Sequence, residues 1–190
     1  MADWVGEAEF LKHTEERMHK AEEALSRELA SLRTGRASTA LVDGIKIEAY
    51  GSTTPLSQLA GITTPEPRLI VIQPWDRNII GDIERAILKS GLGLTPANDG
   101  QVIRLPIPPL TEERRKDLVK LARHKGEEGR VSVRQARREA NDELKSREKD
   151  GDVTEDEHHR IAAKVQELTD QGIARIDDVL GRKEKEIMEG

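Results

Sequence analysis

The chain has 190 residues, carries a formal net charge of −5 at pH 7, and is 35% charged but only 2% aromatic. Leu, Ile, Val and Ala must therefore form most of any core, which is typical of long amphipathic helices. Cysteine is absent from the sequence, which excludes disulfides and thiolate zinc sites and is compatible with a reducing cytosol. There is no signal-peptide pattern and no apolar run near the roughly 20 residues that cross a bilayer. We therefore expect a soluble, cytoplasmic protein.

The first predicted element is a long helix. Leu11, Met18, Leu25 and Leu32 recur every seven residues, and neither Pro nor Gly interrupts the stretch that they span. A single helix is therefore expected over about residues 5–34, with a length of roughly 45 Å at a rise of about 1.5 Å per residue.

The heptad pattern stops at "TGRAS", and a small α/β unit is predicted after it. The segment "IKIEAY" at 45–50 alternates apolar and polar residues as a half-buried strand does, while "RLIVIQ" at 68–73 is a β-branched run suited to a buried strand. Helical spacing returns over residues 78–90. A third strand is predicted for "QVIRLPI" at 101–107, with Pro106 marking its exit.

Two more long helices are predicted in the last part of the chain. Thr111 is a good N-cap before an acidic first turn, and helix-compatible sequence follows it to about Lys149. The segment "DGDV" ends this helix. Thr154, with Glu157 three residues later, matches a capping box and opens the last helix.

None of these three helices can bury its apolar side alone, so we expect them to pack as an antiparallel bundle. The predicted fold class is α+β: a three-helix bundle of residues 1–35 and 111–190, with a β/α/β domain of residues 36–110 inserted. Both connections lie at one end of the bundle, which predicts an L-shaped, two-domain protein with a double-stranded hinge. Glycine permits and proline stiffens such a hinge. The predicted hinge residues are Gly35, Arg36, Pro106, Pro108 and Pro109.

Positive charge is concentrated in one part of this acidic chain. Residues 111–138 hold ten basic and five acidic residues. Arginines recur there with a helical period, which places their guanidinium groups along one side of the second long helix. The stripe consists of Arg130, Arg134, Arg137 and Arg138, with Arg123 one heptad before Arg130.

Two interpretations of the arginine stripe compete. Arginines on a long helix are commonly a solvated face paired with acids on neighbouring helices. Only Glu127, however, lies at helical spacing before Arg130, and arginine is the side chain suited to bidentate phosphate contact and base stacking. A narrow stripe on an acidic protein therefore favours one docked orientation on a structured nucleic acid over general coating.

Four segments together resemble the bacterial ribosome recycling factor family: "LRTGRAS", "YGSTTPLSQLA", "GLTPANDGQVIRLPIPPLTEERRKDL" and "VRQARREAND". Order and spacing match from about Leu11 to Glu189. The resemblance implies the same bundle and inserted domain, and a place in the intersubunit space of the post-termination ribosome. There the family works with elongation factor G, whose GTP hydrolysis helps to split the subunits and to release mRNA. It implies no enzyme activity and no cofactor, and we expect a monomer.

The resemblance also implies roles for individual residues. The contacts with ribosomal RNA of the large subunit fall on Arg134, Arg137 and Arg138, with Arg130 and Arg33 nearby, and the hinge falls on Gly35-Arg36 and Pro106 to Pro109. The first residues, "MADWVGEAE", extend beyond the usual start of the family and receive no function. Two glycines, Gly126 and Gly129, lie inside the second long helix and are expected to weaken it by roughly 1 kcal/mol each.

Two other classes of function remain open from the residues alone. A helical adaptor or chaperone would bind proteins and carry the arginine stripe incidentally. An enzyme would need a converging polar cluster in residues 36–110, and none is apparent in the sequence. His158 and His159 point about 100° apart on a helix and have no third ligand at a suitable spacing, so no metal site is predicted.

Overall fold

The computed structural model describes residues 3–189, and its internal contacts divide the chain into two compact units. One unit combines Met1–Leu29 with Val119–Lys185, and the other combines Ala30–Leu118 with Glu186–Gly190. Residues 1, 2 and 190, which were expected in the bundle domain, lie outside the described residues. Within residues 3–189, no helix has both the length and the apolar character needed to cross a membrane.

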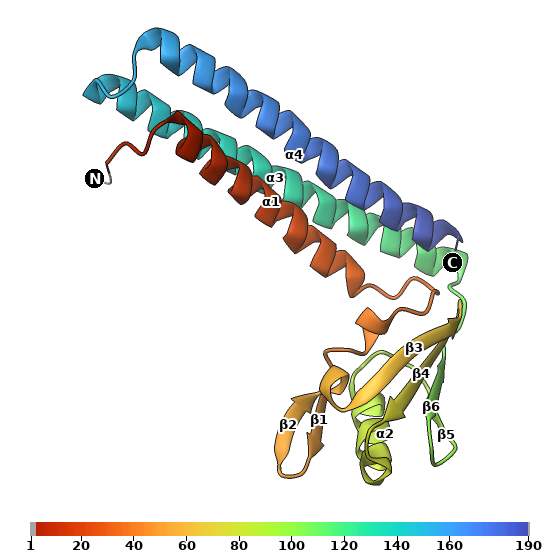
Figure 1. Cartoon of the computed structure of the whole chain (residues 1–190). Coiled ribbons are helices and arrows are strands. Elements are labelled where there is room, and N and C mark those ends of the chain that lie inside the picture. The colour runs from red at the N-terminus through yellow and green to blue at the C-terminus, as the bar shows by residue number, and fades with distance from the viewer. Residues whose placement is uncertain (1–2, 190) are drawn as a thin grey trace. The chain divides into compact units, whose positions relative to one another are not determined.

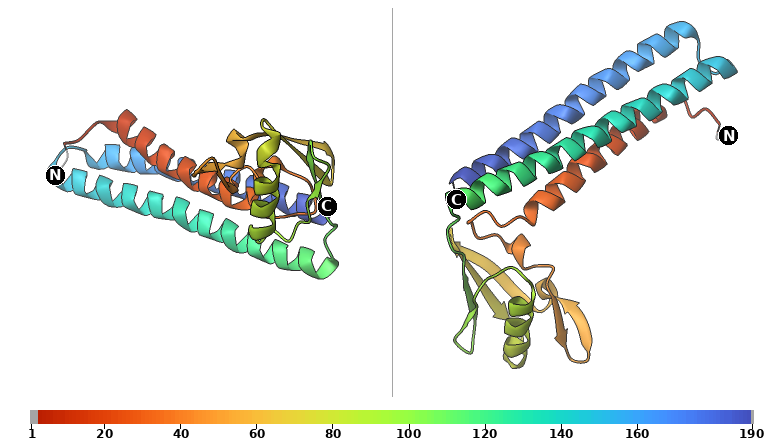
Figure 2. Two further views of the ribbon diagram at one scale, coloured as in Figure 1. Left: turned by 90° about the horizontal axis from the view of Figure 1, so that it is seen from below. Right: turned by 180° about the vertical axis from the view of Figure 1, so that it is seen from behind.

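Three long helices dominate the first unit: α1 (Glu7–Ala30), α3 (Glu112–Asp150) and α4 (Glu155–Glu189). They lie side by side, and α3 runs in the opposite direction to α1 and α4 (Figures 1 and 2). Their apolar residues at heptad spacing face one another, as the sequence predicts. Buried between the helices are Met18, Leu25 and Leu29 of α1, Val133, Ala136, Ala140 and Leu144 of α3, and Ile161, Val165 and Ile176 of α4.

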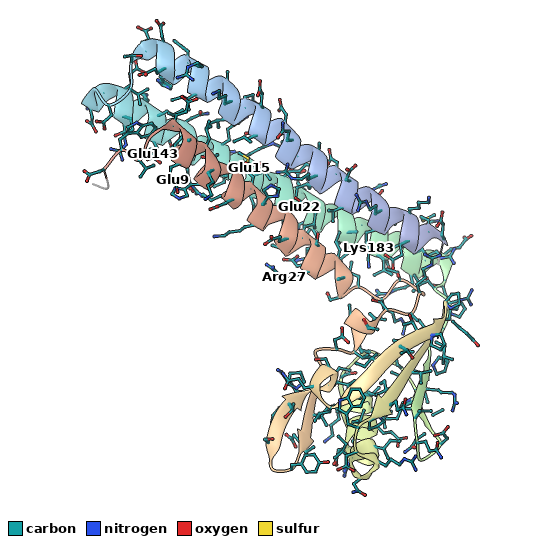
Figure 3. The ribbon with its side chains drawn as sticks, in the orientation of Figure 1. Glu9, Glu15, Glu22, Arg27, Glu143 and Lys183 are labelled. Carbon is teal, nitrogen blue, oxygen red and sulfur yellow. The ribbon has the colours of Figure 1, made fainter. Side chains whose placement is uncertain are left out.

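Ion pairs between helices flank this core. Glu22 of α1 accepts a hydrogen bond from Arg175 of α4 at 2.9 Å (Figure 3). Lys125 of α3 lies 3.3 Å from the carboxylate of Glu28 on α1. Such half-exposed pairs contribute little energy each, but they oppose a rotation of one helix relative to another.

Helix α1 is shorter than the predicted helix of residues 5–34, because the chain leaves the helix after Ala30. The Arg33 guanidinium donates to the carbonyl oxygen of Leu92 at 3.2 Å, and the Thr34 hydroxyl donates to the Glu186 carboxylate at 3.0 Å. Both contacts join residues that are far apart in the sequence. The predicted end of this helix was therefore wrong for a tertiary reason that heptad spacing does not show.

The junction between α3 and α4 has the predicted capping box. The amide of Glu157 donates to the Thr154 hydroxyl at 3.2 Å, and the amide of Thr154 donates to the Glu157 carboxylate at 2.8 Å. These hydrogen bonds from Thr154 lower the pKa of Glu157 below its ordinary value of 4.5. Gly151, with φ of +84°, makes the turn between the two helices.

Glycines within the helices allow α3 and α4 to approach closely. Helix α3 continues through Gly126 and Gly129 as one element of 39 residues. A Cβ atom at Gly126 would lie 2.7 Å from Leu180, and one at Gly129 would lie 3.0 Å from Ile176. These two glycines therefore contribute to packing against α4, which offsets their lower helix propensity.

The second unit contains a hairpin and a four-stranded antiparallel sheet. The hairpin pairs β1 (Lys46–Ala49) with β2 (Ser52–Pro55). The sheet has the order β3-β4-β6-β5, with the following bounds: β3 Ala60–Glu66, β4 Leu69–Pro74, β5 Ala97–Asn98 and β6 Ile103–Pro106. One helix, α2 (Ile80–Lys89), packs with them (Figure 1). Completely buried isoleucines fill this core: Ile47, Ile70, Ile72, Ile83 and Ile103.

The sequence predicts three of these strands and misses the others. Strands β1 and β6 fall within the predicted ranges and β4 extends one residue beyond its range, to Pro74; each presents alternating or continuous apolar residues. Strand β3, with the sequence AGITTPE, is mostly exposed at the edge of the sheet and contains Gly and Pro. Such a strand has no distinct periodicity, so it is recognised only by its pairing with β4.

The N-terminal segment, to which the sequence assigns no function, packs against α3 and α4 within the first unit. The Trp4 and Phe10 rings have centroids 5.6 Å apart, and the Arg147 guanidinium lies 5.8 Å from the centre of the Trp4 ring. Glu7 accepts hydrogen bonds from Arg160 at 2.9 Å and from Lys164 at 2.6 Å. This segment therefore joins α1 to α4 near the start of each helix.

We expect the contribution of Glu7 to stability to depend on pH. Lys164, and then Arg160, hold its pKa below the ordinary 4.5. A lowered folded-state pKa stabilises the fold above the unfolded pKa, and this stabilisation is lost as the pH falls through the folded value. Glu7→Gln should lower Tm by about 1–3 °C at pH 7, and the difference should shrink towards zero in acid. Thermal unfolding followed by circular dichroism across pH checks this, with Glu23→Gln as the matched control.

Candidate nucleic-acid interface

The arginine stripe lies on α3 beside the buried face of that helix. Val133, Ala136 and Ala140 point into the core, and the arginines occupy the neighbouring side, next to α4. The helical period places the stripe along one side of α3, as the sequence predicts, and the structure shows that this side borders the core. The partners of each guanidinium group decide how much of the stripe is available to a ligand.

Arg130 is engaged within the bundle. Its Nε donates to Asp177 of α4 at 2.8 Å, and its Nη1 donates to Glu127 at 3.0 Å. Only 23% of the side chain is exposed. These hydrogen bonds, with Asp177 first, raise the pKa of Arg130. At this position the interpretation as a paired helix face is correct.

Arg134 shares an acid with Arg130. Its Nη1 lies 3.3 Å from the second carboxylate oxygen of Glu127, and 38% of its side chain is exposed. The hydrogen bond from Arg130, and then the nearby charge of Arg134, lower the pKa of Glu127 below 4.5. With Asp177 on Arg130, two carboxylates face these two guanidinium groups, so this part of the stripe is close to neutral.

Arg137 and Arg138 have no acidic partner among the described residues. The Arg137 Nη1 reaches only the neutral side-chain oxygen of Gln166, at the long distance of 3.5 Å. The Arg138 side chain is exposed and has neither a hydrogen bond nor an ion pair within residues 3–189. These two guanidinium groups are therefore the most available for an anionic ligand.

Arg33 belongs to the other unit. Its guanidinium is partly buried and donates to the Leu92 carbonyl oxygen at 3.2 Å. A hydrogen bond to a neutral carbonyl leaves the charge of Arg33 uncompensated. It also fixes the segment that precedes the expected hinge at Gly35, so Arg33 has a structural contact in addition to its predicted contact with RNA.

The expected hinge residues lie close to the turn between β3 and β4. Gly35 is buried and has φ of +80°, which favours glycine, and Arg36 is exposed. Directly after them, the amide of Ala37 donates to the Pro67 carbonyl oxygen at 2.7 Å. The first connecting segment is thus attached to the sheet from Ala37 onward.

The second connecting segment is attached to the same turn. The amide of Ile107 donates to the Arg68 carbonyl oxygen at 2.7 Å, and Pro106 is the last residue of β6. Pro108 and Pro109 follow, exposed, before α3 begins. Of the predicted hinge prolines, only these two lie outside the sheet.

The sequence also missed two features of the interface. Asp177 neutralises part of the charge of Arg130 but lies 47 positions away, so no spacing rule within one helix identifies it. Lys145 and Lys149 are exposed and continue the stripe beyond Arg138, at spacings of seven and four residues. The period that identifies the arginines could have identified these lysines.

The His158-His159 pair lies at the start of α4. The Nδ1 atom of His158 hydrogen-bonds to the Glu148 carboxylate. In the described part of the chain, no group of three His, Cys, Asp or Glu residues is arranged to hold a metal ion.

Comparison with known protein families gives a specific match. The model of the family described as "Ribosome recycling factor" matches residues 25–188. The ribosome-recycling factor of Halalkalibacterium halodurans is 60% identical over 181 residues, covering 95% of this chain and 98% of the relative. That of Bacillus pumilus is 55% identical, with the same coverage.

Solved structures agree with the sequence comparison. The solution structure of a ribosome recycling factor matches with a TM-score of 0.78 and 46% identity, covering 99% of this chain and 100% of that one. A second match, with a TM-score of 0.68, 48% identity and coverage of 96% and 99%, comes from models of the T. thermophilus ribosome recycling factor and E. coli elongation factor G. That pair is bound to the E. coli post-termination complex.

Proposed function

This chain belongs to the ribosome recycling factor family, and from that membership we propose that it separates the subunits of the ribosome after translation termination. The family is a non-catalytic translation factor, so the enzyme alternative is set aside. The proposed partners are the post-termination ribosome and elongation factor G, the two components that accompany a structural relative with 48% identity. GTP hydrolysis belongs to elongation factor G.

The bundle of residues 1–35 and 111–190 is the proposed RNA-binding domain. The observation that supports this most strongly is the state of Arg137 and Arg138, which have no carboxylate partner in the described chain, although acidic residues are abundant on α4. Guanidinium groups without an acidic partner bind phosphate without first breaking an ion pair. Arg134 shares the Glu127 carboxylate with Arg130. The hydrogen bond to Asp177 of α4 fixes the orientation of the Arg130 side chain.

Binding to isolated large subunits should weaken with salt. Each phosphate contact releases counterions, so three to five contacts should lower the affinity by roughly tenfold or more between low and moderate salt. Sedimentation of the protein with purified large subunits across a salt series measures this slope. A flat dependence would indicate a protein-protein interface and support the adaptor interpretation instead.

The inserted domain of residues 36–110 is proposed to move about the two connecting segments during splitting. The hydrogen bonds of Ala37 and Ile107 to the β3-β4 turn hold the ends of both segments on the sheet. Backbone rotation is therefore expected at Gly35-Arg36 and Pro108-Pro109, and less at Pro106, which pairs with Leu69 in the sheet. A hinge of a few residues at the ends of elements suits motion driven by a partner protein.

Restraining the first connecting segment should slow the splitting of ribosomes. The chain lacks cysteine, so Arg33→Cys and Ser90→Cys can be joined by a short bismaleimide linker without side reactions. We expect the linked protein to split ribosomes at least several-fold more slowly than the same double variant with each thiol capped separately. Light scattering of ribosomes with elongation factor G and GTP measures splitting. Equal rates for the linked and capped proteins would contradict the hinge.

A further inference from the structure

Two of the four aromatic residues of this chain are exposed on the second unit. Tyr50 is 70% exposed and Trp75 is 73% exposed, whereas the Phe10 side chain is buried. The Tyr50 hydroxyl donates to the carboxylate of Asp76, the residue directly after Trp75. Asp76 therefore connects the two exposed aromatic residues, and we call these three residues the aromatic patch (Tyr50, Trp75 and Asp76).

The backbone at Tyr50 is strained to hold this ring at the tip of the hairpin. Tyr50 has φ of +54°, the only non-glycine residue with a positive φ in the described chain, and Gly51 follows with φ of +74°. Gly and Asn occupy such a turn with less strain than a bulky aromatic residue. Strain that persists at an exposed position indicates that the side chain has a use beyond the turn itself.

One edge of the Trp75 ring lies against strand β3. A Cβ atom at Gly61 of β3 would lie 3.4 Å from the Trp75 ring, so glycine lets the ring rest against the strand. The Trp75 amide also donates to the Leu59 carbonyl oxygen at 3.0 Å. The contact at Gly61 restricts the ring, which lowers the side-chain entropy lost when a partner binds to it.

Carboxylates lie on the Tyr50 side of the patch. A hollow of about 420 Å³ beside Tyr50 is lined by Glu48 and Asp82 as well as by the hairpin turn. The hydrogen bond from Tyr50, and then that from the Asn78 amide, lower the pKa of Asp76 and keep it ionised. The hydrogen bond to Asp76 raises the pKa of Tyr50, and the charges of Asp76 and Asp82 add to this effect. The cations nearest in sequence are Lys46, Arg77 and Arg85; Arg85 is paired with Asp82, and none of the three lines the hollow.

We propose that the aromatic patch docks a protein segment that presents a lysine or arginine, with the cation in the hollow beside Tyr50 and Glu48 and an apolar part of the segment on the Trp75 ring. Aromatic rings attract cations, and the carboxylates complement the same charge. The same carboxylates repel phosphate, which disfavours base stacking of an RNA on these rings. The proposal rests on the proposed function, because the ribosomal complex supplies the partner.

Site-specific photocrosslinking on post-termination ribosomes tests the proposal. Thr53→p-benzoylphenylalanine places the probe in the hollow beside Tyr50 and leaves both rings intact, and Gln101→p-benzoylphenylalanine is the exposed control. We expect a crosslink at Thr53 that resists ribonuclease, with a lysine- or arginine-containing peptide identified by mass spectrometry. Elongation factor G is added in one arm and omitted in the other, which shows whether it carries that segment.

Three substitutions in the probe-bearing protein define the contact. Trp75→Ala and Tyr50→Asn should each lower the crosslink yield about tenfold, as for central contacts of an interface. Asn suits the positive φ at residue 50, so the Tm of the Tyr50→Asn variant should not fall. An unchanged Tm distinguishes a lost contact from a folding defect. Glu48→Lys should lower the yield about fivefold.

Several results would overturn the proposal: a ribonuclease-sensitive crosslink, no crosslink at Thr53, or yields that the three substitutions do not change. Sedimentation with ribosomes is measured for each variant in parallel. If the unsubstituted protein itself fails to bind ribosomes, the proposed function fails, and this result is distinct from a loss of crosslinking in a protein that still binds.

Discussion

Arg137→Ala should lower the affinity for isolated large subunits by roughly 10- to 100-fold, because a charged hydrogen bond contributes about 1.5–3 kcal/mol. Within the protein, Arg137 donates only to Gln166 at 3.5 Å, so its removal should cost little stability. Alanine also preserves the helix. The expected result is therefore a nearly unchanged Tm with a large loss of binding in sedimentation assays.

Two further variants complete this experiment. Arg137→Gly should lose the same binding and, in addition, about 1 kcal/mol of helix stability, which separates the lost contact from a weakened helix. Arg27→Ala removes an exposed arginine of α1 that lies outside the stripe (Figure 3), so its binding should stay close to that of the unsubstituted protein. Binding of Arg137→Ala at full affinity would refute the RNA contact.

Gly172→Leu should destabilise the bundle by about 3 kcal/mol, near the upper end for overpacking of a core. A Cβ atom at Gly172 would lie 3.1 Å from Val133, which is completely buried, and 3.6 Å from the Cβ of Met18. Valine has one preferred rotamer in a helix, so it cannot turn away. The remaining atoms of leucine would then force α4 away from α3 and α1.

Gly181→Leu is the matched control for this substitution. Gly181 lies in the same helix and is exposed, and a Cβ atom at this position would meet no other atom within 4 Å. Leucine has a better helix propensity than glycine, so this variant should gain up to about 1 kcal/mol. Urea unfolding of both variants gives the two free energies, and a stable Gly172→Leu protein would show that the helices can move apart at little cost.

Elements with strong local signals could be predicted without the structure. The heptads of the three long helices, the capping box at Thr154 and the apolar strands β4 and β6 depend on residues close in sequence. A short edge strand such as β5, with two exposed residues, carries no such signal. It exists because β6 offers unpaired backbone groups, which is a property of the assembled sheet.

In the candidate site, too, some features follow from residues close in sequence and others only from the packed structure. Helical spacing alone places the four arginines of the stripe on one side of α3, because 3.6 residues per turn apply to any helix. Whether each guanidinium group is paired depends on α4. Asp177 engages Arg130, while the residue that α4 presents to Arg137 is the neutral Gln166.

The sequence by itself determined the helix-forming segments, their buried sides and the position of the arginine stripe, since each follows from periodicity within one element. Only the tertiary structure decided where α1 ends, which arginines lack an acidic partner, and why Gly126, Gly129 and Gly172 stand within helices. The physical reason is the same in each case. These properties are set by the distance between side chains on different elements, and that distance exists only once the helices and strands have packed together.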